Sequence, residues 1–212
     1  MSKKSDVLVQ DLRSRFISLE KTRVKMEKLF KEGSLSRSDI EKVYESLFMR
    51  TITYFEGFIE ELFFGLVTNK VKLPIGGAGV KIKFKTESLA REIVFAGKNY
   101  YDWFPYDQTE RLAKRFLRDG HPFTMLNLAP NDKKDAKNDI SSMLIVRNII
   151  AHQSSFSKKR FQEEVISKTL GLLPKEKSPA GFLRNQFRVS PDQTRFENYQ
   201  LRIVDIAKKI AG

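Results

Sequence analysis

The chain has 212 residues, 41% of them hydrophobic, which fits one ordinary folded domain and argues against a wholly disordered chain. It contains no cysteine, which excludes disulfides, thiol nucleophiles and thiolate metal sites and favours a reducing, cytoplasmic location. The 39 Lys and Arg residues outnumber the 26 Asp and Glu residues, and the net charge of +13 favours a polyanionic partner such as nucleic acid.

Two long helices are predicted in the N-terminal part of the chain. Apolar residues recur every three or four positions over 6–31, and Gly33 follows as a stop signal. A second helix is predicted over 38–68, where Ser38 and Glu41 have the spacing of a capping box. Its many phenylalanines and leucines predict that this second helix is the spine of the core.

Residues 73–134 are predicted to hold inserts and shorter helices. The segment 80–85 alternates like a short strand, and we interpret its lysines as blunting an exposed sheet edge rather than as a phosphate track. Helices are expected over 86–95 and 108–118. The aromatic stretch 100–106 between them is interpreted as packing on the core or at a subunit interface rather than as a base-stacking surface.

The C-terminal part is predicted to consist of two helices and an insert. A helix is expected over 135–152, and another over 195–210 closes the fold. Between them, 172–191 carries several prolines and basic residues and is predicted to be irregular. The expected fold is therefore a single all-α domain over 1–212, a bundle of up-and-down core helices with a small basic loop or strand insert and a C-terminal helix.

The helix predicted over 135–152 carries the residues with the clearest chemical potential. At about 100° per residue, one arc of this helix is apolar and expected to face the core; it consists of Met143, Ile145, Val146, Ile149 and Ile150. Arg147, Asn148 and His152 fall on the opposite arc, where Asn148 and His152 are neighbours because four residues separate them. Arg147 lies across the small Ala151 from His152, which leaves a shallow gap for a phosphate.

Arg147-Asn148-x-x-x-His152 matches the Arg-Asn-x-x-x-His signature of the HEPN superfamily of small helical nucleases, and the chain resembles that family. The long helix around 54–60 looks like the first core helix of several HEPN branches. A basic insert and a final helix after the motif are similar too. The resemblance implies an HEPN-like bundle and metal-independent cleavage of RNA, in which a 2′-hydroxyl attacks its own phosphodiester.

The motif residues have chemically distinct expected roles. His152 is assigned to proton transfer and Arg147 to the charge that develops on the phosphorane oxygens. Asn148 either orients the histidine, binds the phosphate, or caps the helix end locally. Taken singly, Arg147 or His152 also fits a charge that merely stabilises a helix end, whereas their combination favours catalysis. Glu56 is a candidate supporting acid that orients Arg147 or His152, and an ordinary solvated glutamate is its other interpretation.

Several further expectations concern partners and cofactors. Lys158, Lys159 and Arg160 follow the motif and are candidates for binding an RNA backbone, although a solvated charge run explains them equally well. A single His152 cannot readily act on both sides of phosphorus, and family members pair two motif helices across a twofold interface, so we expect a homodimer with a composite site. No cofactor or metal is expected, because no cluster of metal-ligating residues is visible. His121 lies in a turn sequence and is predicted to be a surface residue.

Two functions are therefore considered. The first is an RNA endonuclease, a toxin or defence effector with an antitoxin or defence-system protein as a partner. The alternative is a catalytically inactive helical module that binds RNA or a protein. Ser154 stands where some HEPN toxins carry a tyrosine that a partner nucleotidyltransferase modifies, which argues against regulation by that route. No membrane association is expected, because no helix pairs a clean apolar face with a wholly basic one.

Overall fold

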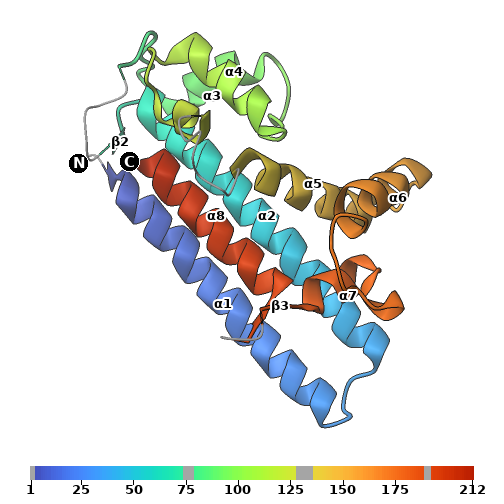
Figure 1. Ribbon diagram of the computed structural model, residues 1–212. Helices are drawn as coiled ribbons and strands as arrows, with labels where there is room; N and C mark the ends of the chain where they lie inside the picture. Colours follow the sequence, from blue (N-terminus) through green and yellow to red (C-terminus); the bar gives the residue numbers. More distant parts are fainter. Residues whose placement is uncertain (1–2, 74–78, 128–135, 189–191) are drawn as a thin grey trace. The chain divides into compact units, whose positions relative to one another are not determined.

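The computed structural model describes residues 3–73, 79–127, 136–188 and 192–212 (Figure 1). Helix dominates these residues, and the predicted all-α fold with a C-terminal helix and only short strands is confirmed. The α-helices are α1 (Ser5–Lys31), α2 (Arg37–Val67), α3 (Glu87–Phe95), α4 (Tyr106–Phe116), α5 (Ala136–His152), α6 (Ser155–Phe161), α7 (Pro179–Arg184) and α8 (Arg195–Ala211). The shorter elements are β1 (Lys3–Lys4), β2 (Val71–Lys72), η1 (Pro122–Asn127), the π-helical turn η2 (Gln162–Ile166), η3 (Pro174–Glu176), β3 (Gln186–Arg188) and β4 (Gln193–Thr194).

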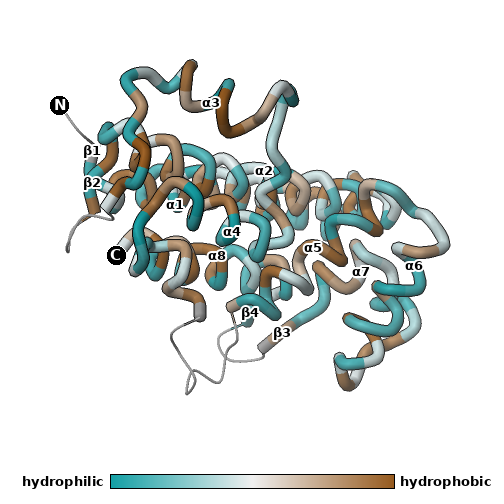
Figure 2. The backbone as a smooth tube through the Cα atoms, turned by 90° about the horizontal axis from the view of Figure 1, so that it is seen from above, coloured by the Kyte–Doolittle hydropathy of each residue, from teal (hydrophilic) through white to brown (hydrophobic). Residues whose placement is uncertain are grey.

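The long helices lie close to the ranges that the sequence predicts. α1 matches the range 6–31, and Gly33 follows it with a φ of +77°, the left-handed conformation typical of a residue that ends a helix. α8 matches the predicted final helix over 195–210. Figure 2 shows hydrophobic residues alternating with hydrophilic ones along the helices, as expected where a helix buries one side.

The predicted cap of the second helix is wrong by two residues. α2 begins at Arg37, and its capping box is formed by Ser36 and Asp39: the backbone N–H of Ser36 donates to the Asp39 carboxylate (3.0 Å), and that of Asp39 donates to the Ser36 hydroxyl (3.2 Å). Ser38 lies inside the helix, and Glu41 accepts a bond from Arg37 instead. The sequence offers two Ser-x-x-acid patterns here, and the earlier one satisfies the first free N–H groups.

The chain forms two compact units, which are described separately. The first consists of Met1–Arg13, Phe55–Lys137 and Val204–Gly212, and the second of Ser14–Tyr54 and Asn138–Ile203. α1, α2, α5 and α8 contribute residues to both units. The single domain expected over 1–212 stays a prediction.

The core of the first unit contains a cluster of aromatic side chains. Phe63 of α2 is fully buried, and its ring centroid lies 5.4 Å from that of Trp103 and 5.9 Å from that of Phe116 in α4. Such pairs contribute about 0.5–1.5 kcal/mol beyond the area that they bury. The interpretation of 100–106 as a segment packed on the core is therefore confirmed for its buried residues, whereas Tyr100 is exposed.

The strand predicted over 80–85 is wrong beyond its first residue. Val80 forms an isolated antiparallel bridge with Leu117, and the rest of the segment is irregular. The backbone N–H of Lys81 donates to the carbonyl oxygen of Phe116 (2.7 Å) and that of Phe84 to the carbonyl oxygen of Val67 (3.0 Å), so the hydrogen bonds of this segment go to two different helices rather than to one partner strand. Residues 74–78 of the loop predicted before this segment lie outside the described residues.

His121 is buried, so its predicted place on the surface is wrong. Its side chain is 1% exposed, and its ring centroid lies 6.2 Å from that of Phe123. Within the described residues, neither ring nitrogen has a hydrogen-bond partner. Burial lowers the pKa of this imidazole, so the neutral form is favoured in the folded protein.

The second unit is organised around α8. The ring of Tyr199 in α8 lies 5.7 Å from that of Phe48 in α2, and the Tyr199 hydroxyl lies 2.9 Å from the hydroxyl of Ser142 in α5. Asp139 of α5 accepts a hydrogen bond of 2.6 Å from Arg202 of α8. These contacts attach the motif helix α5 to α8, and both helices can be followed in Figure 1.

The predicted irregular insert over 172–191 is partly wrong, because it contains the short helix α7. Phe182 of α7 is buried, with its ring centroid 5.9 Å from that of Phe161 and 6.4 Å from that of Tyr199. Ser178 caps this helix, accepting a bond from the Gly181 N–H. β3 and β4 follow as a two-stranded antiparallel pair.

Candidate functional site

The motif helix has the two faces that the sequence predicts. α5 buries Met143, Ile145, Val146 and Ile149, whereas Ile150 of the predicted core arc is only partly buried. Arg147 and Asn148 are partly exposed and His152 is exposed. α5 ends at His152 because Gln153 adopts a left-handed φ of +46°, and Ser154 then caps α6. The imidazole therefore sits on the last helical residue, next to solvent.

Arg147 and Asn148 are joined directly. The Arg147 Nη1 donates a hydrogen bond of 3.0 Å to the Asn148 Oδ1. An arginine carries five N–H donors, so this bond orients the guanidinium and leaves further donors for an anion. The structure thus supports a role for Asn148 that the sequence analysis did not name, which is to position Arg147.

A cavity of about 180 Å³ lies beside the motif helix. Its lining residues from α5 are Ile145, Asn148 and His152, and those from the turn and α6 are Ser154, Phe156, Ser157 and Arg160. Two motif residues, Asn148 and His152, therefore share one concave site. Arg147 is not among the lining residues and is bonded to one of them, Asn148.

The three basic residues after the motif have different surroundings. Arg160 lines the cavity and is bound to the Glu164 carboxylate by Nε (2.6 Å) and Nη2 (3.1 Å). The hydrogen bond to Glu164 raises the pKa of Arg160, and the reciprocal bond lowers the pKa of Glu164. Lys159 lies 4.0 Å from Glu163, and Lys158 lines a different cavity of about 320 Å³. The continuous basic track considered from the sequence is therefore not gathered at one cavity.

Glu56 is not brought into the described cavity. It lies on α2 and belongs to the first unit, whereas Arg147 and His152 belong to the second. Its supporting role stays a prediction.

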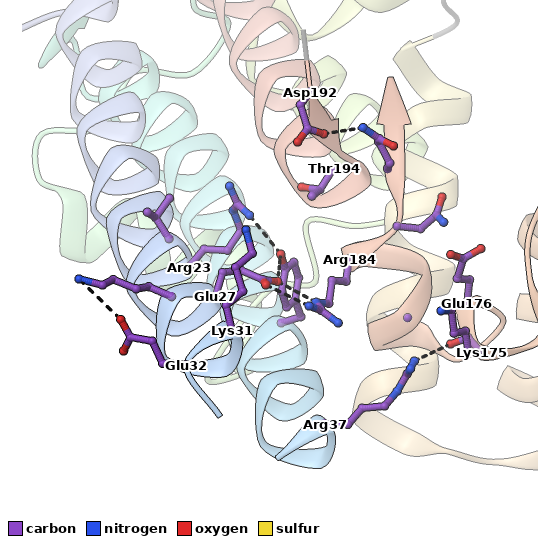
Figure 3. Close-up of a pocket in the computed structure, with 16 residues that line it drawn as sticks. Arg23, Glu27, Lys31, Glu32, Arg37, Lys175, Glu176, Arg184, Asp192 and Thr194 are labelled. Atoms are coloured by element: carbon purple, nitrogen blue, oxygen red, sulfur yellow. Dashed lines mark hydrogen bonds and ion pairs between the residues drawn. The ribbon is translucent and has the colours of Figure 1, made fainter. Parts of the chain in front are cut away.

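A larger polar cleft of about 890 Å³ occupies another part of the second unit (Figure 3). Glu27 of α1 is at its centre, where it accepts bonds from Arg184 Nε (2.7 Å), Arg184 Nη2 (3.0 Å) and the Tyr44 hydroxyl (2.9 Å). Arg23 in turn donates to the Tyr44 hydroxyl (3.1 Å). The charges at the centre of this cleft therefore satisfy one another, which fits a role in joining α1, α2 and α7.

The described residues hold neither a cluster of metal ligands nor a membrane span. In this part of the chain, no three His, Asp or Glu side chains gather closely enough to hold a metal ion. Among the described helices, none combines the length and apolar character needed to cross a membrane.

Phe156 and Ser157 are cavity residues that sequence reasoning missed, and Phe156 is the more exposed of the two. It is 69% exposed and lies on the cavity with His152. The signal was an aromatic residue directly before a basic run, in Ser155-Phe156-Ser157-Lys158. Its approach to His152 depends on the turn at Gln153, which periodicity along one helix does not predict.

Comparison of the chain with protein-family models, with curated proteins and with solved structures finds no match.

Proposed function

We propose that the chain is a metal-independent endoribonuclease of the HEPN type. The observation that carries the proposal is the joint placement of Asn148 and His152 on one accessible cavity, with Arg147 held by Asn148 at 3.0 Å. A guanidinium and an imidazole are groups of the kind that phosphodiester transesterification requires, one to stabilise charge on the phosphorane oxygens and one to transfer protons. The net charge of +13 supports RNA as the substrate.

The chemistry follows from these side chains. His152 of one copy accepts the 2′-hydroxyl proton, and the 2′-oxygen attacks phosphorus. Arg147 stabilises the added negative charge on the phosphorane oxygens. His152 of a second copy donates a proton to the departing 5′-oxygen, and the products are a 2′,3′-cyclic phosphate and a 5′-hydroxyl end. Because one imidazole serves each side of phosphorus, the proposed enzyme is a homodimer with a composite site.

The test is a cleavage assay on single-stranded RNA with a chelator present. His152→Ala and Arg147→Ala are each expected to lower the cleavage rate by about 10²-fold or more, the usual contribution of an acid–base or charge-stabilising group. Arg50→Ala removes an exposed arginine of α2 and is the matched control for lost charge. Cleavage that survives both motif substitutions overturns the site, and cleavage that requires a metal ion overturns the mechanism.

The composite site has its own test. Parent protein and His152→Ala are mixed in different ratios, and their subunits are allowed to exchange. If each site needs two His152 side chains, an equal mixture retains about a quarter of the parent activity, because only parent homodimers are active. Retention of about three quarters would show that one histidine per composite site suffices, and retention of about half would show that each copy works independently with its own His152.

A catalytically inactive module that binds RNA or a protein is the second candidate. It is favoured by the position of His152, since a cation at the end of a helix also stabilises the helix dipole. The two candidates differ in one measurement: the inactive module binds RNA without producing cyclic phosphate ends. A role as a toxin or defence effector predicts that the parent, but not His152→Ala, arrests the growth of a host cell.

A further inference from the structure

An aromatic ring at the cavity beside His152 is exposed to solvent, and packing against the core does not account for this exposure. Phe156 is 69% exposed, although burying a phenylalanine side chain contributes about 1.5–3 kcal/mol. The guanidinium of Arg160 lies 5.9 Å from the centroid of this ring, which is a cation–π contact. An exposed aromatic ring that lines a cavity is a stacking surface for another flat ring.

The size of the cavity suits one such ring. Its volume of about 180 Å³ is below the range of roughly 300–1,000 Å³ typical of sites for drug-sized ligands. Ile145, which is buried, supplies an apolar wall, and Phe156 supplies the aromatic one. These proportions fit a single nucleobase rather than a whole nucleotide.

The polar groups of the cavity suit a base edge. The hydroxyl oxygens of Ser154 and Ser157 lie 2.7 Å apart, and Ser154 Oγ also accepts a bond from the Ser157 N–H (3.1 Å). The Ser157 hydroxyl also donates to the Ser154 carbonyl oxygen (3.1 Å), so both hydroxyl protons are used within the pair, and each hydroxyl oxygen keeps one acceptor position for an N–H group of a base edge. The placement of the pair is determined by the cap of α6 rather than by a flexible loop.

The two arginines near the motif, Arg160 and Arg147, differ in whether a carboxylate already balances their charge. Arg160, the cation that lines the cavity, already holds the Glu164 carboxylate through two hydrogen bonds of 2.6 and 3.1 Å. Its charge is therefore balanced, and the side of the cavity formed by Phe156 and Arg160 favours a neutral ring over an anion. Arg147 lies outside the lining and is the guanidinium left for a phosphate.

We infer that Phe156, Arg160, Ser154 and Ser157 form a nucleobase subsite, in which one unpaired base of single-stranded RNA stacks on Phe156 next to the phosphate at His152. The inference rests on the proposed function, which supplies the substrate class. It adds the residues that hold the base, with Phe156 as the stacking surface and the two serines as the groups that face its edge.

The test measures binding in a background that cannot cleave. His152→Ala is combined with Phe156→Ala, and the affinity for a short single-stranded RNA is measured by fluorescence anisotropy at fixed salt. Binding is expected to weaken about ten- to hundred-fold, the usual loss for one stacked base, and Phe156→Tyr should restore it. Phe187→Ala, which removes another exposed phenylalanine of the second unit, is the matched control and should not change the affinity.

A second measurement uses the RNA itself. A series of oligonucleotides is used, each lacking the base at a different position of the strand. For one of them, Phe156→Ala should no longer weaken binding, because the base that stacks on Phe156 is already absent. The subsite is overturned if the double variant His152→Ala, Phe156→Ala binds the RNA as tightly as His152→Ala alone. It is also overturned if Phe156→Ala weakens binding equally for every position of the abasic site. A change of oligomeric state with unaltered affinity also overturns it, since Phe156 would then be an interface residue.

These outcomes are distinct from failure of the nuclease proposal. If the parent does not cleave RNA but binding depends on Phe156 and on one base, the subsite stands and the proposed catalysis does not. If the parent cleaves RNA with no dependence on Phe156 or on a single base, the catalysis stands and the subsite does not.

Discussion

Replacing Glu27 with glutamine should destabilise the second unit although it changes only a charge and one polar atom. The Glu27 carboxylate accepts two hydrogen bonds from Arg184 and one from Tyr44 (Figure 3). Glutamine keeps a single oxygen acceptor and turns its amide donors toward the guanidinium. The variant therefore leaves a partly buried cation without its counter-charge.

The expected cost is set by how deeply the pair is buried. The Glu27 and Arg184 side chains are 15% and 27% exposed, so the pair is closer to a buried ion pair than to a surface one. Breaking a fully buried pair costs about 3–5 kcal/mol and breaking a surface pair about 0–1 kcal/mol. A bond to a charged group contributes about 1.5–3 kcal/mol, so we expect Glu27→Gln to cost about 2 kcal/mol.

The same pair predicts a dependence on pH. Burial alone would raise the pKa of Glu27, but hydrogen bonds from Arg184 and Tyr44 outweigh it, and the pKa lies below its ordinary value of 4.5. A lowered carboxyl pKa stabilises the fold above the unfolded value, and this contribution is lost as pH falls through the folded value. The difference between the parent and Glu27→Gln should therefore shrink below about pH 4.5.

The assay is urea unfolding followed by circular dichroism at pH 7 and at acidic pH. Glu32→Gln is the matched control in the same cleft, because its carboxylate lies 3.8 Å from Lys28 and is 49% exposed. Glu32→Gln should lower the free energy of unfolding by less than about 0.5 kcal/mol. The reasoning from burial would be refuted if Glu27→Gln and Glu32→Gln lowered the free energy of unfolding equally. It would also be refuted if the difference between the parent and Glu27→Gln were the same at acidic pH as at pH 7.

Three further predictions concern single side chains. His121→Leu should remove a pH dependence: the lowered pKa of His121 means that its stabilising contribution is complete above about pH 6.5 and is lost as pH falls below it, with a slope of at most about 1.4 kcal/mol per pH unit. Unfolding from pH 7 to pH 5 checks this, and equal slopes for the parent and the variant would contradict it. Tyr199→Phe removes the 2.9 Å bond to Ser142 and should cost about 1 kcal/mol in urea unfolding. Ser142→Ala should then cost less in the Tyr199→Phe background than in the parent, because the shared bond is already lost, and equal costs would show that the two hydroxyls act separately. Ser36→Ala removes the hydroxyl that caps α2 beside Asp39 and should cost about 1 kcal/mol, whereas Ser38→Ala should cost much less; the reverse order would restore the cap predicted from the sequence.

The sequence by itself determined the helices and the two faces of the motif helix. Helix periodicity and end signals act between residues a few positions apart, so 6–31 and 195–210 were predicted close to α1 and α8. The same local geometry placed Arg147, Asn148 and His152 opposite the buried arc of α5.

Only the tertiary structure decided which residues surround the motif. The cavity exists because the chain turns at Gln153 and brings Phe156 and Arg160 beside His152. The burial of His121 likewise depends on packing within the first unit, where its imidazole lies 6.2 Å from the ring of Phe123 and is 1% exposed. Helix periodicity cannot predict such placements, because it describes one helix at a time and gives neither the direction of the chain after a turn nor what covers a residue outside a helix.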